Sequence, residues 1–100
     1  MADPGVRGVV AVARVEIRIP AAASLKDKRS VVKSFCERAR QRFGLAVAET
    51  GRQEDPRRAS LTLAAVSGSG AVARQSLRAA VAFLEETYEV EVLEAVEEIF

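Results

Sequence analysis

The first pattern along the chain is an alternation of apolar and other residues between positions 9 and 19. The intervening positions become charged in the second half of this run, at Arg14, Glu16 and Arg18. A period of two is typical of a strand that buries one of its faces. Pro20 follows, and it has no backbone N–H with which to continue a strand ladder. We therefore predict a first strand that ends before Pro20.

A helical pattern occupies the next part of the chain, up to Gly44. Its apolar residues recur at spacings of three and four, which is typical of a helix with one buried side. These residues are Leu25, Val32, Phe35, Cys36, Ala39 and Phe43. Ser24 and Asp27 have the spacing of an N-cap and its capping-box partner, and Gly44 is a typical C-terminal stop. The sequence therefore predicts a helix over residues 25–43.

The rest of the chain gives two more strands, a second helix and a last strand. We predict a short strand over residues 45–49 and a polar loop over residues 50–56. Apolar positions alternate over residues 58–66, which predicts a further strand. Glycine and serine at 67–70 interrupt the pattern. The second helix is predicted from the apolar stripe Ala73, Leu77, Ala80, Val81, Leu84 and Tyr88. Residues 90–100 then read as the last strand.

The predicted order is strand, helix, strand, strand, helix, strand. This order folds most simply as a ferredoxin-like α+β plait, a four-stranded antiparallel sheet with two helices on one face. Right-handed crossovers place the first and third strands at the centre of such a sheet. The last strand, which contains four glutamates, would then form an edge. We expect residues 1–5 to be a loose extension and residues 6–100 to form a single domain.

The composition excludes several classes of chemistry. The 100 residues are 49% hydrophobic and 29% charged, as in an ordinary soluble domain, and they include no histidine. Imidazole general bases and the commonest transition-metal ligand are therefore absent. The lone cysteine, Cys36, can form neither an internal disulfide nor a thiolate cage, which suits a reducing cytoplasm. We expect a non-enzymatic protein with no cofactor and no metal. Charged residues interrupt the first apolar run, so we expect neither a signal peptide nor a membrane span.

The net charge of +1 conceals a strong segregation of charge along the chain. Residues 1–43 carry a net charge of +6, whereas residues 79–100 contain seven glutamates and no basic residue. The predicted first helix alone has seven basic and two acidic residues. Such a helix could bind the phosphates of RNA, or it could be a solvated face that the acidic segment balances. The candidate nucleic-acid contacts are Lys26, Lys28, Arg29, Lys33 and Arg40.

The face of the predicted sheet that the helices leave open offers a second hypothesis. None of the five aromatic residues lies in the two central strands, so this face lacks the stacking platform of an RNA-recognition domain. About half of its positions are apolar or small, which is typical of a contact surface. It could therefore serve a homodimer or a protein-interaction adaptor. The candidate partner-face residues are Val10, Val12, Arg14, Arg18, Arg58 and Thr62.

Several short blocks together resemble a known family. These blocks are Arg14–Ile19 before Pro20, Ser24-Leu25-Lys26-Asp27-Lys28-Arg29, Val31-Val32-Lys33 and Val47-Ala48-Glu49. They are similar to the YlxP-like bacterial family, a group classed as domain of unknown function 503. The resemblance implies a ferredoxin-like plait, a cytoplasmic bacterial protein and an RNA or ribosome context, since relatives are typically encoded among translation genes. It implies no catalytic residues.

Overall fold

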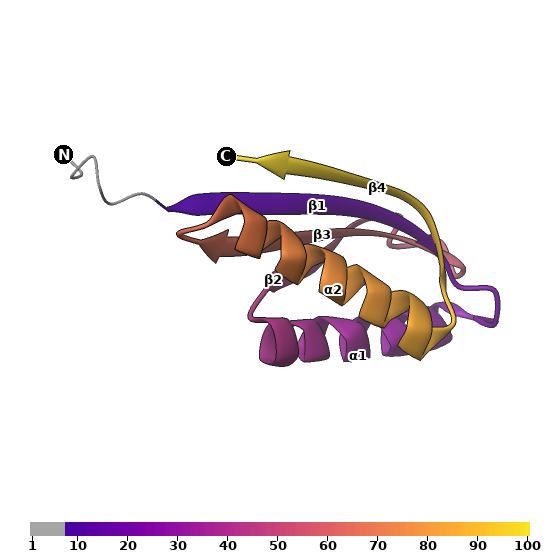
Figure 1. Cartoon of the computed structure of the whole chain (residues 1–100). Helices are drawn as coiled ribbons and strands as arrows, with labels where there is room; N and C mark the ends of the chain where they lie inside the picture. The colour runs from indigo at the N-terminus through magenta and orange to yellow at the C-terminus, as the bar shows by residue number, and fades with distance from the viewer. Residues whose placement is uncertain (1–7) are drawn as a thin grey trace.

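The computed structural model describes residues 8–100, and the extension predicted for residues 1–5 lies outside this range. The six elements confirm the predicted order. They are β1 (Val9–Arg18), α1 (Leu25–Phe43), β2 (Ala46–Gly51), β3 (Arg58–Ser67), α2 (Gly70–Tyr88) and β4 (Glu91–Ile99). Figure 1 shows the strands as one layer with both helices below it. This is the ferredoxin-like α+β plait that the sequence predicts.

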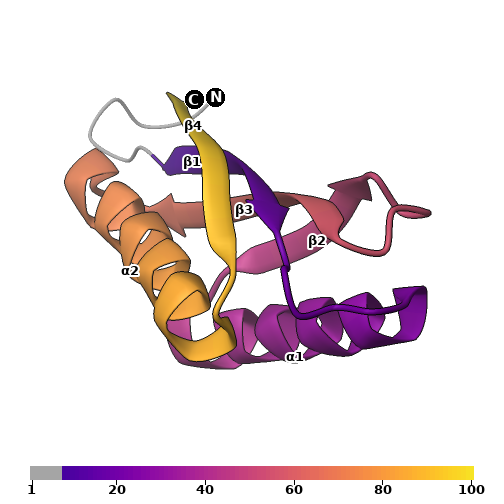
Figure 2. The ribbon, with the colours of Figure 1, turned by 90° about the vertical axis from the view of Figure 1, so that its right-hand side faces the viewer.

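The four strands form one antiparallel sheet in the order β2-β3-β1-β4. As predicted, β1 and β3 lie at the centre and β4 lies at an edge. In β1 the residues Ala11, Ala13, Val15 and Ile17 are buried on the helix side of the sheet. α2 packs on the two central strands, and α1 lies beside α2 and along β2 (Figure 2). The helices therefore leave most of β4 uncovered.

Local signals place the ends of α1 where the sequence predicts them. The Ser24 hydroxyl accepts a hydrogen bond from the Asp27 N–H at 3.1 Å. The Asp27 carboxylate in turn accepts from the N–H of Ala23 at 2.9 Å, one residue earlier than in a standard capping box. Gly44 ends the helix with φ of 66°, a left-handed conformation that glycine adopts without steric cost.

The hairpin between β2 and β3 differs from the prediction. Thr50 and Gly51 extend β2 instead of belonging to the loop, because β2 stays paired with β3 past an irregularity that places Gly51 opposite Ser60. The loop is accordingly shorter. The Asp55 carboxylate closes it by accepting hydrogen bonds from the N–H groups of Arg57 at 2.9 Å and Arg58 at 3.2 Å.

The aromatic residues of the helices pack against one another, as their spacing predicts. Phe35, Phe43, Phe83 and Tyr88 form three edge-to-face contacts with ring centroids 5.6 to 6.2 Å apart. This geometry is the favourable one for aromatic pairs. The cluster fills the seam between α1 and α2 and fixes how the two helices lie against each other.

Candidate nucleic-acid interface

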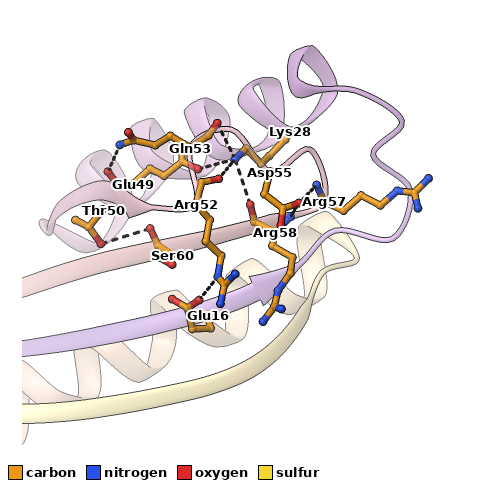
Figure 3. A network of polar contacts seen from close by, with 10 residues as sticks. All are labelled: Glu16, Lys28, Glu49, Thr50, Arg52, Gln53, Asp55, Arg57, Arg58 and Ser60. Atoms are coloured by element: carbon orange, nitrogen blue, oxygen red, sulfur yellow. Dashed lines mark hydrogen bonds and ion pairs between the residues drawn. The ribbon is translucent and has the colours of Figure 1, made fainter.

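Lys28 is the most deeply buried charged residue in the described chain, with none of its surface exposed. Its Nζ donates hydrogen bonds to the backbone carbonyls of Arg52 at 2.7 Å, Gln53 at 3.3 Å and Arg58 at 3.2 Å (Figure 3). Glu49 Oε2 lies 3.0 Å from the same nitrogen. Because an ammonium has three protons, the three carbonyls use all of them and Glu49 acts mainly as the counter-ion.

This network gives Lys28 a structural role. It ties the first turn of α1 to the loop between β2 and β3, and Arg57 reinforces the same junction by donating from Nε to the Ala22 carbonyl at 3.1 Å. A buried lysine that uses every proton inside the protein cannot contact a phosphate. The expectation that Lys28 belongs to an exposed nucleic-acid surface is therefore wrong, because α1 turns this side chain toward β2 and its loop.

The other predicted contacts lie together on one side of α1. Lys26, Arg29, Lys33 and Arg40 are all exposed and recur at spacings of three, four and seven residues. At 3.6 residues per turn these spacings place the four side chains along one line of the helix, which we call the basic flank. Arg40 fixes where this line lies, since its Nη2 donates to the Val47 carbonyl of β2 at 2.8 Å. The basic flank therefore follows the outer edge of the sheet at β2.

Two further arginines of α1, which were not among the predicted contacts, lie on the opposite side of the helix. The Arg42 guanidinium lies 4.9 Å from the ring centroid of Phe83, and that of Arg38 lies 5.9 Å from the centroid of Tyr88. With Gln41 they line a cavity of about 290 Å³. The spacing of four residues between Arg38 and Arg42 indicates that they share one side of α1. The aromatic rings that they contact lie in α2, so they could not be identified from the sequence of α1 alone.

The acidic residues of β4 find their partners away from the basic flank. Their ion pairs reach β1 and α2 in the combinations Arg14 with Glu98, Arg18 with Glu91 and Arg78 with Glu97. Arg18 and Arg78 each use two nitrogens on the carboxylate, at distances between 2.9 and 3.2 Å. Among residues 8–100, Lys26, Arg29 and Lys33 make no ion pair. The acidic strand thus does not neutralise the basic flank through direct contacts.

Most polar residues of the predicted partner face hold one another across the sheet. Arg14 and Arg18 form ion pairs with glutamates of β4, and the Thr62 hydroxyl lies 2.8 Å from the hydroxyl of Thr50. Arg58 is half-buried, and Arg58 Nε is buried without a hydrogen-bond partner in the described part of the chain. The apolar part lies at the other end of the sheet, where Val10 and Val12 lie beside Val66 and Ala64. The structure therefore divides this face into a polar and an apolar end.

Three titratable groups show how the fold changes their acidity. The pKa of Glu16 is lowered by a hydrogen bond from Ser60 and by the guanidinium of Arg52, whose Nε lies 2.7 Å away. The pKa of Asp55 is lowered by the backbone N–H of Arg57, and that of Arg58 adds to the effect. Burial raises the pKa of the Cys36 thiol. A thiol that is buried and hard to ionise is a poor nucleophile.

Sequence comparison identifies the family. The profile described as "Protein of unknown function (DUF503)" matches residues 10–96. The chain belongs to the DUF503 family. One similar protein is the "Uncharacterized protein YlxP" of Bacillus subtilis (strain 168), which is 34% identical over 83 residues. The alignment covers 83% of this chain and 90% of that protein. Membership in DUF503 confirms the resemblance drawn from the sequence blocks between Arg14 and Glu49.

Two solved structures share this fold with the chain at low sequence identity. A C-terminal segment of the alpha subunit of aIF2 from Pyrococcus abyssi superposes with a TM-score of 0.60 at 19% identity, over 92% of this chain and 50% of that one. The de novo designed protein Foldit4 gives 0.54 at 13% identity, over 92% of this chain and 97% of that one. At these identities the likeness establishes the fold alone.

Residues 8–100 lack two kinds of feature. No helix there is both long and apolar enough to cross a membrane. No group of three or more acidic, cysteine or histidine side chains in that range is arranged to hold a metal ion.

Proposed function

We propose that this DUF503 protein is a cytoplasmic, non-enzymatic RNA-binding module of the translation machinery, and that its basic flank contacts RNA phosphates. The observation that carries the proposal is the placement of Lys26, Arg29 and Lys33, which are exposed on one line of α1 without an ion pair among residues 8–100. Glu37 lies on the same line between Lys33 and Arg40, so the unbroken group of cations is residues 26–33. Cations grouped in this way are suited to a polyanion, because each neutralised phosphate releases bound counterions.

The separation of charge in the fold supports the same proposal. β2, beside the basic flank, and β4, which holds four glutamates, are opposite edges of the sheet. Three strand spacings separate them, about 14 Å. Because the Debye length is about 8 Å at physiological ionic strength, glutamates at that distance screen the basic flank only weakly. The positive electrostatic field of the basic flank is therefore available to attract an anionic ligand.

The proposed mode of binding is recognition of the RNA backbone. Residues 26 to 33 span about 10 Å of helix, long enough to contact consecutive phosphates. The central strands offer no aromatic side chain on which bases could stack, so sequence-specific readout by the sheet is not part of the proposal. The buried Cys36 and the absence of histidine support a binding role over catalysis.

The test compares two charge-reversed triple variants. Lys26→Glu/Arg29→Glu/Lys33→Glu changes the basic flank, whereas Arg38→Glu/Arg42→Glu/Arg74→Glu makes the same change in net charge elsewhere. Binding of a fluorescent RNA hairpin and co-sedimentation with ribosomal subunits are measured as the salt concentration is raised, after circular dichroism has shown that both variants are folded. Lys28 is left intact, because its loss would destabilise the fold.

We expect only the first variant to lose binding. The wild-type protein should show a log–log salt dependence with a slope of about −2 to −3, as expected for three phosphate contacts, and the first variant a slope near zero. Equal weakening in both variants would mean that net charge alone attracts the RNA. Unchanged binding in a folded flank variant would refute the proposal. The adaptor role of the outer sheet face stays a prediction.

A further inference from the structure

β4 is an unusually uncovered strand. It is paired on one side only, with β1, and every residue in it except Val92 is exposed. Among the large apolar residues, Leu93 is 46%, Val96 45% and Ile99 39% exposed. A strand with apolar side chains, an open edge and few covering contacts is suited to pairing with another strand.

The direction of the backbone groups of β4 follows from its last ladder contact. Val10 and Phe100 exchange two hydrogen bonds, at 3.2 Å and 2.8 Å. In an antiparallel ladder such pairs recur every second residue, so Glu98, Val96 and Glu94 also bond to β1. The N–H and C=O groups of the residues between them point away from β1. The free edge is therefore formed by the backbone of Ala95, Glu97 and Ile99.

The middle of β4, residues 93–97, matches itself in an antiparallel register. If two copies of the strand pair about Ala95, Glu94 lies opposite Val96 and Glu97 opposite Leu93. The register of β4 against β1 shifts at Leu93, so the matched stretch is residues 93–97, and both of its glutamates lie opposite apolar residues. Centring on Val96 instead places Glu94 opposite Glu98, and centring on Glu97 places that residue opposite itself, which is destabilising. Only the first of these three registers avoids contacts between like charges.

The remaining charges of the edge also suit a second copy. Glu91, Glu97 and Glu98 each have an arginine of their own chain, so the strand presents much less negative charge than its sequence implies. Arg74 lies one turn before Arg78 on α2, and with it lines a cavity of about 330 Å³. Arg74 is close enough to Glu97 to contribute to lowering its pKa. It therefore adds positive charge beside the acidic edge.

We propose that two copies of this chain pair through β4, antiparallel and centred on Ala95, to form one continuous sheet of eight strands. A two-fold axis beside Ala95 makes the interface isologous, so the same residues serve both copies. The interface joins the free backbone edge of each chain and covers Leu93 and Val96. It differs from the outer-face dimer predicted from the sequence, because the sheets extend edge to edge and do not stack.

The experiment measures the mass of the full-length protein by sedimentation equilibrium over a wide concentration range. We expect a dimer for the wild-type chain. Val96→Glu should raise its dissociation constant at least about tenfold, because the new carboxylates face Glu94 of the second copy twice. Val96→Lys, which faces the same glutamates with the opposite charge, should dimerise at least as well as the wild type.

Two further variants separate this interface from other dimers. Ala95→Pro removes an N–H that points away from β1, so it should leave the monomer folded and raise the dissociation constant at least about tenfold. Val66→Lys changes an exposed apolar residue on the outer face of β3 and should leave the dimer unchanged. A wild-type monomer at millimolar concentration overturns the proposal. So does a dimer that Val66→Lys dissociates, or one in which Val96→Glu and Val96→Lys act alike.

Discussion

The buried ammonium of Lys28 leads to the sharpest prediction about stability. Lys28→Met keeps most of the aliphatic stem but removes the charge and all three donors. Glu49, whose side chain is 17% exposed, then remains without its counter-ion, and the carbonyls of Arg52, Gln53 and Arg58 lose their donor. The change therefore leaves both an uncompensated charge and unpaired polar groups in the interior.

The expected loss of stability in Lys28→Met follows from two estimates. At 3.0 Å and an effective dielectric constant of about 20, the attraction between Lys28 and Glu49 is about 5.5 kcal/mol. Breaking a buried ion pair by removing one partner typically costs about 3–5 kcal/mol. Water that reaches the loop carbonyls will recover part of their hydrogen bonds. We expect Lys28→Met to lower the free energy of unfolding by about 3–5 kcal/mol, out of a total of about 5–15 kcal/mol for a protein domain.

The assay is urea unfolding followed by circular dichroism, with Lys26→Met as the matched control. Lys26 is the same residue type on an exposed face, and its replacement should change the stability by no more than about 0.5 kcal/mol. In the double variant Lys28→Met/Glu49→Gln, the loss should be smaller than the sum of the two single losses by about 0.5–3 kcal/mol. A cost below about 1 kcal/mol for Lys28→Met, or additivity in the double variant, would contradict the structural role of Lys28.

Two further predictions concern pH and the thiol. Hydrogen bonds from Arg18 and Arg78 hold the pKa values of Glu91 and Glu97 below 4.5 in the folded state, so the unfolded chain binds more protons. These carboxylates stabilise the fold above pH 4.5, and this stability should be lost as the pH falls further. Urea unfolding at several pH values below 4.5 should show that the free energy of unfolding depends less on pH in Arg18→Gln/Arg78→Gln than in the wild type. Cys36 should react with a thiol reagent only on unfolding, since it is buried and burial raises its pKa; rapid labelling under native conditions would contradict this.

The periodicity of the sequence was sufficient to predict the elements and their order. Alternation identified β1 and β3, and the helical stripes together with Ser24 and Gly44 identified α1 and its ends. These signals are local, because they arise from which side of an element faces the core. The extension of β2 through Thr50 and Gly51 was missed, because it depends on pairing with β3 past an irregularity that no local pattern shows.

The candidate site was predicted only in part, and Lys28 shows why. Its charge suggested a surface position, although it stands four residues before Val32 and seven before Phe35, on the stripe that faces the core. That spacing was the available signal. What made burial favourable was a set of carbonyls 24 to 30 residues away and the carboxylate of Glu49, which the fold alone brings to the ammonium.

The strand order gives the basic flank and the acidic strand β4 separate positions in the molecule. The basic flank follows β2 at one edge of the sheet, and the glutamates of β4 occupy the other. Pairing of two copies through β4 would extend the sheet away from α1 and leave both basic flanks at its outer ends. Seven strand spacings, about 34 Å, would separate these ends. An RNA long enough to span them could engage both flanks at once, whereas a short hairpin could engage only one. The proposed RNA binding and the proposed self-association would therefore use opposite edges, and neither would require surface that the other covers.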